Sequence, residues 1–460
     1  TLAGLAGLPH VGGVANRLDT ERVNRTVSEV NTLLNQREQF FLDHNIDSMA
    51  TYRRRRAAGE FADEPHGDVF LVVDGWGTLR QDFDALLPTL NQIAARGLNY
   101  GIHLAVATAR WLELSPQVRD QAATRLELRL GDAMDSVVDI RKAGTVPRSP
   151  GRGLTTDGKL HFLAALPRID GSESADDLTE GVAGLVERVA GCWPGPAAPP
   201  VRTLPHRLSV SELPEPELAE GLRVPLGLDE ETLSPVWHDF SRTPHLIGIG
   251  DTESGKTNLL RLVASAVTAR YSPNEARILV VDYRRTLVEA VPEEYRLGHA
   301  VSMDALRELV DGSARAIATR LPGPDISPSR MRLADWWTGP RLFVLIDDYD
   351  MVGGGFSVGH PFDPLSDHLT LGHEVGLHMV VMRSATGAAR GLNDPLLRRL
   401  DEVNTPGVLL SCPPSEGYLF GTVKPRNLPP GRAQYIARRK GVLVQTALLD
   451  EPPGGAPTGT

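Results

Sequence analysis

Short apolar runs alternate with stretches of helical periodicity along the C-terminal half of the chain. Ile278–Tyr283, Leu342–Asp347 and Leu377–Met382 are rich in β-branched residues, as expected for strands that are buried on both faces of a parallel sheet. Between the first two runs, apolar residues recur at near-helical spacing: Leu306, Leu309, Val310, Ile317 and Leu321. The alternation predicts an α/β fold whose sheet is mainly parallel and flanked by helices.

The N-terminal half repeats this pattern in the same order. VFLVVDGW (Val69–Trp76) matches LFVLIDDY (Leu342–Tyr349), and GIHLAVATAR (Gly101–Arg110) matches GLHMVVMRSA (Gly376–Ala385). Shorter matches flank these two: Thr1 and Thr286, Leu2 and Leu287, Gly13 and Gly298, Ala15 and Ala300, Asp19 and Asp304, Arg22 and Arg307, and Pro150–Arg152 and Pro430–Arg432. The matched positions lie about 273 to 285 residues apart, which indicates a tandem duplication of one α/β unit.

The sharpest break in composition, CWPGPAAPPVRTLP, separates the two copies. Proline at this density favours an extended spacer. We therefore predict a first domain over residues 1–191, a proline-rich linker over 192–205, a second domain over 206–450 and a structureless tail over 451–460. Because the second copy has about 80 residues before Thr286, the first copy is expected to lack its N-terminal part, and we expect that part upstream of residue 1.

Composition narrows the class of protein. Apolar residues make up 41% and charged residues 23%, which is typical of a globular chain. The net charge of −10 counts against a nucleic-acid partner, and no apolar run is long enough to span a membrane. The two cysteines have no metal-ligand spacing. We expect a soluble, cytoplasmic fragment.

The strongest motif is GDTESGKT, which satisfies G-x-x-x-x-G-K-[ST] in full. An apolar run, His245–Ile249, precedes the motif, and a helical stretch, Asn258–Arg270, follows it, as a phosphate-binding P-loop requires. In such a loop, backbone N–H groups converge on the phosphates and the lysine reaches the β- and γ-phosphates. The residues predicted to bind ATP are Gly250, Asp251, Thr252, Glu253, Ser254, Gly255, Lys256, Thr257 and Asn258.

The run Leu342–Asp347 ends in an acid, as a Walker B strand does, so Thr257 and Asp347 are the predicted ligands of Mg²⁺. Many P-loop ATPases place Glu next, where it polarises the attacking water. Here that position is Asp348, one methylene shorter, which predicts slow hydrolysis. The matching strand of the first copy ends in Asp74-Gly75, with no second acid.

Two arginines are further candidates for catalysis. Arg383 follows the strand Leu377–Met382, where γ-phosphate sensors commonly lie, although a surface loop is an equal alternative. Arg432 and Arg152 occupy matching Pro-Gly-Arg turns, as arginine fingers or as domain contacts.

Together with the duplication, LPHVGGVA (Leu8–Ala15), the GIH and GLH strands and GDTESGKTNLLR (Gly250–Arg261) resemble the FtsK/SpoIIIE-type ATPases. More narrowly, they resemble the second and third ATPase domains of the EccC-type ATPases of type VII (ESX) secretion. The resemblance implies tandem RecA-like P-loop domains that bind Mg-ATP. It also implies WXG100-type secreted substrates, other subunits of a membrane complex, an oligomeric intact motor, and attachment to the inner face of the cell membrane through an N-terminal part.

Two alternatives remain open at this point. One is an FtsK-like DNA translocase, which the net charge of −10 disfavours. The other is a docking platform that binds nucleotide as a structural ligand and does not turn it over.

Overall fold

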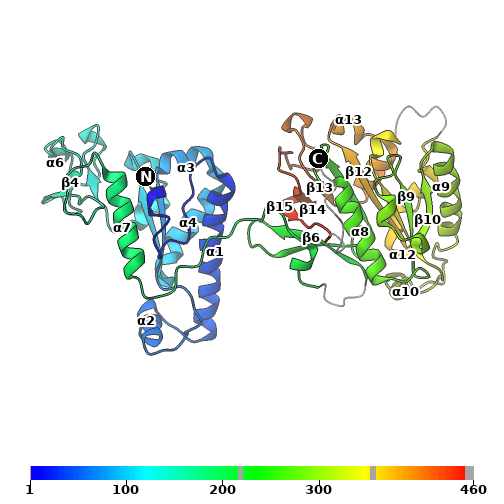
Figure 1. The fold of residues 1–460 in the computed structure, drawn as a ribbon, viewed down its shortest axis with the longest axis horizontal. Coiled ribbons are helices and arrows are strands. Elements are labelled where there is room, and N and C mark those ends of the chain that lie inside the picture. The colour runs from blue at the N-terminus through cyan, green and yellow to red at the C-terminus, as the bar shows by residue number, and fades with distance from the viewer. Residues whose placement is uncertain (1, 216–220, 353–358, 451–460) are drawn as a thin grey trace. The chain divides into compact units, whose positions relative to one another are not determined.

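The computed structural model describes residues 2–215, 221–352 and 359–450. The chain divides into two compact units, Thr1–Thr203 and Leu204–Thr460 (Figure 1). The predicted tail, 451–460, lies outside the described residues. Among the helices that are described, none is long and apolar enough to cross a bilayer.

The second unit is built on one sheet, which over the described residues has ten strands in the order β10-β9-β11-β12-β8-β13-β14-β15-β6-β7. The strands from β10 to β13 run parallel, and the remaining strands pair antiparallel. Their bounds are β6 Arg223–Asp229, β7 Pro235–Asp239, β8 His245–Gly250, β9 Ala276–Val281, β10 Arg296–Ala300, β11 Arg341–Ile346, β12 Leu377–Ser384, β13 Gly407–Leu409, β14 Arg432–Ala437 and β15 Lys440–Thr446. The α/β prediction is confirmed.

Helices cover both faces of this sheet. Successive residues of β8 enter different cores: Leu246 belongs to the core that includes Leu259 of α8, whereas Ile247 belongs to the core that includes Leu306 of α9. This two-sided burial explains the uninterrupted apolar runs in the sequence. The helices are α8 Lys256–Arg270, α9 Met303–Ala318, α10 Pro328–Leu333, α11 Asp363–Ser366, α12 Gly372–Val375, α13 Ala388–Gly391 and α14 Pro395–Glu402.

The first unit holds two small sheets. Strands β1 (Val69–Asp74) and β2 (Ile102–Ala107) pair in parallel, and β3 (Glu127–Leu128), β4 (Arg152–Leu154) and β5 (His161–Leu163) form an antiparallel sheet. The helices are α1 Thr20–Asp43, α2 Met49–Ala57, α3 Trp76–Asp82, α4 Leu87–Arg96, α5 Pro116–Gln121, α6 Ile140–Ala143 and α7 Leu178–Cys192. Helix α7 therefore includes the first residue of the predicted linker.

The repeat is visible in backbone geometry. Gly101 and Gly376, which align in the repeat, have φ of 68° and 69°, and Gly151 and Gly431 have φ of 77° and 76°. By the same alignment, β1 and β2 correspond to β11 and β12, and β3–β5 correspond to β13–β15. In the second unit β8 joins these two groups of strands, whereas no described strand of the first unit does so.

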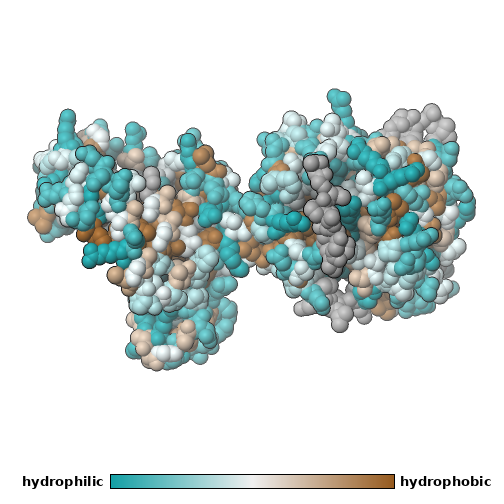
Figure 2. All heavy atoms as spheres, viewed as in Figure 1, coloured by the Kyte–Doolittle hydropathy of each residue, from teal (hydrophilic) through white to brown (hydrophobic). Residues whose placement is uncertain are grey.

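Part of the first unit's sheet surface is apolar and open. Phe70 and Val72 of β1 are 64% and 52% exposed, and Leu163 of β5 is 59% exposed. Figure 2 shows apolar side chains, in brown, reaching the surface of this unit. In the second unit, by contrast, the matching strand β11 is buried along almost its whole length.

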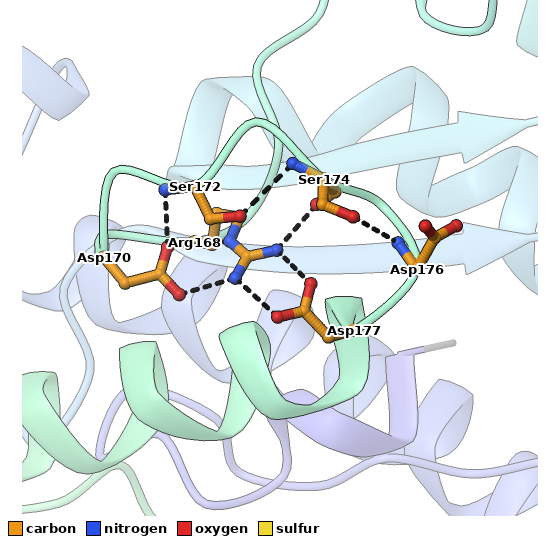
Figure 3. Close-up of polar contacts among 6 residues, drawn as sticks. All are labelled: Arg168, Asp170, Ser172, Ser174, Asp176 and Asp177. Atoms are coloured by element: carbon orange, nitrogen blue, oxygen red, sulfur yellow. Dashed lines mark hydrogen bonds and ion pairs between the residues drawn. The ribbon is translucent and has the colours of Figure 1, made fainter.

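The acidic loop between β5 and α7 is held by one arginine (Figure 3). Arg168 donates to both carboxylate oxygens of Asp170 and of Asp177, at 2.6 to 3.1 Å, and to the Ser174 carbonyl at 2.6 Å. Its side chain is 4% exposed. The two carboxylates are therefore used in fixing the loop onto the start of α7.

Candidate nucleotide-binding site

The P-loop connects the central strand β8 to the longest helix on one sheet face, α8. Gly255 precedes the helix with φ of 119°, a conformation that favours glycine. Gly250 is required for a different reason, because a Cβ there would lie 2.4 Å from Ser254 Oγ and 2.7 Å from Leu410 Cβ. The loop therefore wraps closely at the carboxyl end of a parallel strand, where ligands bind in open α/β sheets.

Lys256 lies over the loop that it belongs to. Its Nζ donates to the carbonyl oxygens of Gly250 at 3.1 Å and Asp251 at 2.9 Å, and the residue is 9% exposed. Ser254 Oγ also donates to the Asp251 carbonyl, at 2.7 Å. The ammonium group is thus held in the concave loop, where it can meet phosphate oxygens.

Thr257 and Asp347, the two predicted metal ligands, are in contact. Thr257 Oγ1 donates to Asp347 Oδ2 at 2.6 Å, and the Asp348 backbone N–H donates to Asp347 Oδ1 at 3.0 Å. Burial raises the pKa of Asp347, and the nearby carboxylates of Asp348 and Asp282 act in the same direction. A buried carboxylate beside a hydroxyl is a donor set that fits Mg²⁺, whose charge would offset this penalty.

The other predicted loop residues divide by exposure. Thr252 and Glu253 are exposed, and Glu253 has a φ of 60°. The Asp251 backbone N–H donates to the Ser411 carbonyl at 2.8 Å. Asn258 Nδ2 donates to the Ala447 carbonyl at 2.7 Å, so this amide connects α8 to the segment after β15. Its role as a nucleotide contact stays a prediction, and it would fall to the backbone N–H because the side chain is used elsewhere.

Asp348 is held in an unusual conformation. Its φ is 45°, and its Oδ2 lies 2.9 Å from Nε of Arg284. Its partner in the repeat, Gly75, has φ of 86°, so the turn after this strand is left-handed in both units. Arg284 was not a predicted site residue. The sequence feature that could have identified Arg284 is its position just after the apolar run Ile278–Tyr283, which places it at the same edge of the sheet as Asp348. Strand β9 itself ends at Val281.

Arg383 lies beside the loop but packs inward. Strand β12 pairs with β8 so that Arg383 is opposite Ile249 and Ser384 is opposite Gly250. Arg383 is 6% exposed, and its Nε donates to the Ser384 carbonyl at 3.2 Å. A Cβ at Gly391 would lie 1.3 Å from its Nη1, so the guanidinium fills the space that this glycine leaves. Whether Arg383 takes part in catalysis stays a prediction.

Arg432 also lies against the P-loop. The neighbouring Gly431 N–H donates to the Ser254 carbonyl at 3.0 Å, and Thr446 Oγ1 donates to the Gly431 carbonyl at 2.8 Å. Arg432 itself is 2% exposed. A side chain buried to this extent does not extend toward a neighbouring subunit, so the geometry does not support an arginine finger acting in trans. A role within its own unit stays a prediction.

Comparison with known proteins identifies the family. The FtsK/SpoIIIE family matches residues 1–170 and 205–311. The chain belongs to this family. It is 50% identical over 449 residues to the ESX secretion system protein EccC of Thermomonospora curvata, covering 97% of this chain and 34% of that protein. It is 35% identical to the ESX-1 secretion system protein EccCb1 of Mycolicibacterium smegmatis, with 97% and 77% covered.

A solved structure agrees over the same range. It is described as Thermomonospora curvata EccC (ATPases 2 and 3) in complex with a signal sequence peptide, and it matches with a TM-score of 0.91, 49% identity, and 98% of this chain and 81% of that chain covered. Within the FtsK/SpoIIIE family the chain is therefore an EccC-type ATPase of type VII secretion. It spans about a third of the length of the T. curvata protein. Membership of this P-loop family implies a nucleotide bound with a divalent cation.

Proposed function

We propose that the second unit binds Mg-ATP on the loop Gly250–Thr257. The observation that carries this proposal is the contact between Thr257 Oγ1 and Asp347 Oδ2, which joins a complete P-loop to the buried acid at the end of β11. Loop N–H groups would hold the phosphates, Lys256 would reach the β- and γ-phosphates, and Thr257 and Asp347 would hold Mg²⁺. The bound metal would supply charge neutralisation at the phosphates.

We propose that hydrolysis at this site is slow. A water-polarising carboxylate must reach the attacking water, and Asp348 is one methylene shorter than the glutamate found in many P-loop ATPases. In addition, its Oδ2 is paired with Arg284 at 2.9 Å. This pairing occupies one of the two carboxylate oxygens and leaves Oδ1 to orient water. Both features support a module that binds ATP well and turns it over slowly.

At the level of the cell, we propose an ATP-binding motor or regulatory module of a type VII secretion machine. The sequence similarity to EccC proteins supports this role, and the matching T. curvata structure was solved with a signal sequence peptide. We propose that the module helps recognise and export WXG100-type substrates. In the intact motor it would act as an oligomer with other subunits, on the cytoplasmic face of the cell membrane.

Nucleotide binding is tested by calorimetry with Mg-ATP. Lys256→Ala should abolish binding because the ammonium in the loop is lost, whereas Lys440→Ala, at an exposed hairpin residue, should bind as the wild type does. Wild-type affinity in Lys256→Ala would refute the site. The secretion role is tested separately by pull-down of a WXG100 dimer beside filter binding to DNA at moderate salt. Retention of DNA without the dimer would favour a DNA translocase instead.

A further inference from the structure

A chain of buried hydrogen bonds begins at the residue that follows Asp347 and Asp348. The hydroxyl of Tyr349 donates to Asp394 Oδ1 at 2.5 Å and lies 2.9 Å from His360 Nε2. Tyr349 is 2% exposed and His360 is 6% exposed. The Phe362 N–H donates to His360 Nδ1 at 3.3 Å, so in the neutral ring Nε2 carries the proton. The chain therefore runs from His360 through Tyr349 to Asp394, and His360 Nε2 also lies 3.4 Å from Asp394 Oδ2.

Each member is anchored on a different segment. Tyr349 begins the short 3-10 turn Tyr349–Met351, and Asp394 is the N-cap of α14, where its Oδ1 accepts the Leu396 N–H at 3.0 Å. His360 is fixed through its own N–H, which donates to Asp363 Oδ2 at 2.8 Å. The chain thus ties the turn after the Walker B strand to two helix starts on one face of the sheet.

The charge states suit this arrangement. Burial, and then the carboxylate of Asp394, raise the pKa of Tyr349, so the phenol keeps its proton and donates it. Burial opposes ionisation of Asp394, but hydrogen bonds from His360 and Tyr349 outweigh it and lower the pKa of this carboxyl. A buried polar network in which every member is bonded is rigid, because breaking any bond exposes a buried group without a partner.

The same turn carries the groups that orient the metal ligand. The Asp348 N–H donates to Asp347 Oδ1, and Asp350 Oδ1 accepts the Ser384 N–H at 2.8 Å. Fixing Tyr349 therefore also fixes Asp348 in its left-handed conformation, in which the Asp348 N–H donates to Asp347. Hydrogen bonds to the outer side of a metal ligand set its orientation and its affinity for the metal.

The first unit shows that this position does not need a hydroxyl for packing. The residue equivalent to Tyr349 in the repeat is Trp76, which is fully buried. Its Nε1 has no hydrogen-bond partner among the residues that the structure describes. The polar atom of the ring thus makes no hydrogen bond within the described part of the first unit, whereas in the second unit the hydroxyl of Tyr349 contacts both His360 and Asp394.

We propose that Tyr349, through its hydrogen bonds to His360 and Asp394, is a positioning residue that holds the Asp347–Asp348 turn in its metal-binding geometry. The proposal rests on the proposed function, because it assumes Mg-ATP at the loop Gly250–Thr257. The hydroxyl is expected to affect metal binding and not the phosphate contacts, because it bonds to His360 and Asp394 whereas Lys256 Nζ bonds to the carbonyls of Gly250 and Asp251.

The test compares Tyr349→Phe with Tyr435→Phe. Tyr435 is a matched control, because its hydroxyl also pairs with a buried histidine, His238 Nδ1, at 3.3 Å. ATP binding is measured by calorimetry in EDTA and then as a function of Mg²⁺ concentration. Tyr349→Phe should bind ATP in EDTA as the wild type does. It should require about 10-fold more Mg²⁺ to reach half of the Mg²⁺-dependent increase in ATP affinity, which is the lower end of the range for loss of a residue that hydrogen-bonds to a metal ligand. Tyr435→Phe should stay within about twofold.

A second pair of variants keeps the test valid if Tyr349→Phe folds poorly. Asp394→Asn retains an oxygen for the phenol and should stay within about twofold of wild type, whereas Asp394→Ala should show the raised Mg²⁺ requirement. Unchanged Mg²⁺ dependence in both Tyr349→Phe and Asp394→Ala would overturn the proposal. Failure of the wild type itself to bind ATP would instead refute the proposed function.

Discussion

Replacing Asp347 by Asn distinguishes the role of Asp347 in metal binding from the effect of its buried charge on the stability of the fold. Asp347 is 4% exposed, and burial raises the pKa of its carboxyl above the ordinary 3.8. A raised folded-state pKa destabilises the folded protein as pH rises above the unfolded value, and this penalty is complete above the folded pKa. Without metal, the protein therefore bears the penalty at neutral pH. Asp347→Asn removes the charge and keeps an oxygen that can accept the Thr257 hydroxyl.

Two opposing terms set the size of the effect without nucleotide. An amide has one acceptor oxygen: if it faces the Asp348 N–H, the Asn Nδ2 can donate to the Thr257 hydroxyl and both contacts remain, whereas the opposite orientation leaves the Asp348 N–H without a partner, at a cost of about 1 kcal/mol. Removal of the buried charge acts in the opposite direction. We therefore expect an unfolding free energy equal to or above that of wild type. With Mg-ATP at 100 times its dissociation constant, the wild type gains about 2.7 kcal/mol, or roughly 5–10 °C for a unit of this size, and the variant should lose the metal-dependent part of this gain.

Thermal unfolding followed by circular dichroism, with and without Mg-ATP, measures both effects. Asp229→Asn is the control, because Asp229 is also buried and accepts hydrogen bonds from Thr232 and Ser234, but in the β6–β7 turn. The control should lose stability and keep its full Mg-ATP shift. The reasoning fails if Asp347→Asn keeps the full shift, or if it is destabilised as strongly as the control without nucleotide.

Two further predictions follow from the second unit. Asp348→Glu should raise the ATP hydrolysis rate in a steady-state assay because the longer side chain reaches the water, and a wild-type rate already near ~10 s⁻¹ would contradict the premise of slow turnover. Acidification should also destabilise this unit. Burial lowers the pKa of His238 to about 3, that of His245 to about 4 and that of His378 well below the ordinary 6.5. The unfolded chain therefore binds protons below pH 6.5 that the folded unit does not, and the unfolding free energy falls by roughly 1.4 kcal/mol per pH unit for each histidine. Equal unfolding free energies at pH 7 and pH 5, from urea titration of the transition that Mg-ATP shifts, would refute this assignment.

Patterns with a strict local requirement were predictable from the sequence. The P-loop was recognisable because close wrapping needs glycine at Gly250 and Gly255, and its strand and helix lie where the motif requires them. The strands were recognisable because burial on both faces removes polar residues from them. The contact between Thr257 and Asp347 was expected because parallel strands of one sheet end at the same edge, although β12 separates the strand before Asp347 from β8.

Features that depend on packing between distant segments were not predictable. Nothing local to Arg432 shows that it is buried, because its burial comes from the strands that surround it. The contact of Arg284 with Asp348 joins the loops after two different strands. The chain of Tyr349, His360 and Asp394 joins residues up to 45 positions apart. A single sequence contains each of these residues but gives no sign that they meet.

The turn after the Walker B strand differs between the two copies of the repeat in the residues that hold its backbone. Both units hold this turn in a left-handed conformation, and the first unit uses Gly75, for which that conformation carries no steric penalty. The second unit places Asp348 there, and a non-glycine residue in this region costs of order 1 kcal/mol or more unless its surroundings hold it. Those surroundings are present: Arg284 pairs with its side chain, Tyr349 is tied to Asp394, and Asp350 accepts the Ser384 N–H. These contacts thus hold Asp348 in a backbone conformation that is unfavourable for a non-glycine residue. The first unit, which has Gly75 and Trp76 at the equivalent positions, does not need them.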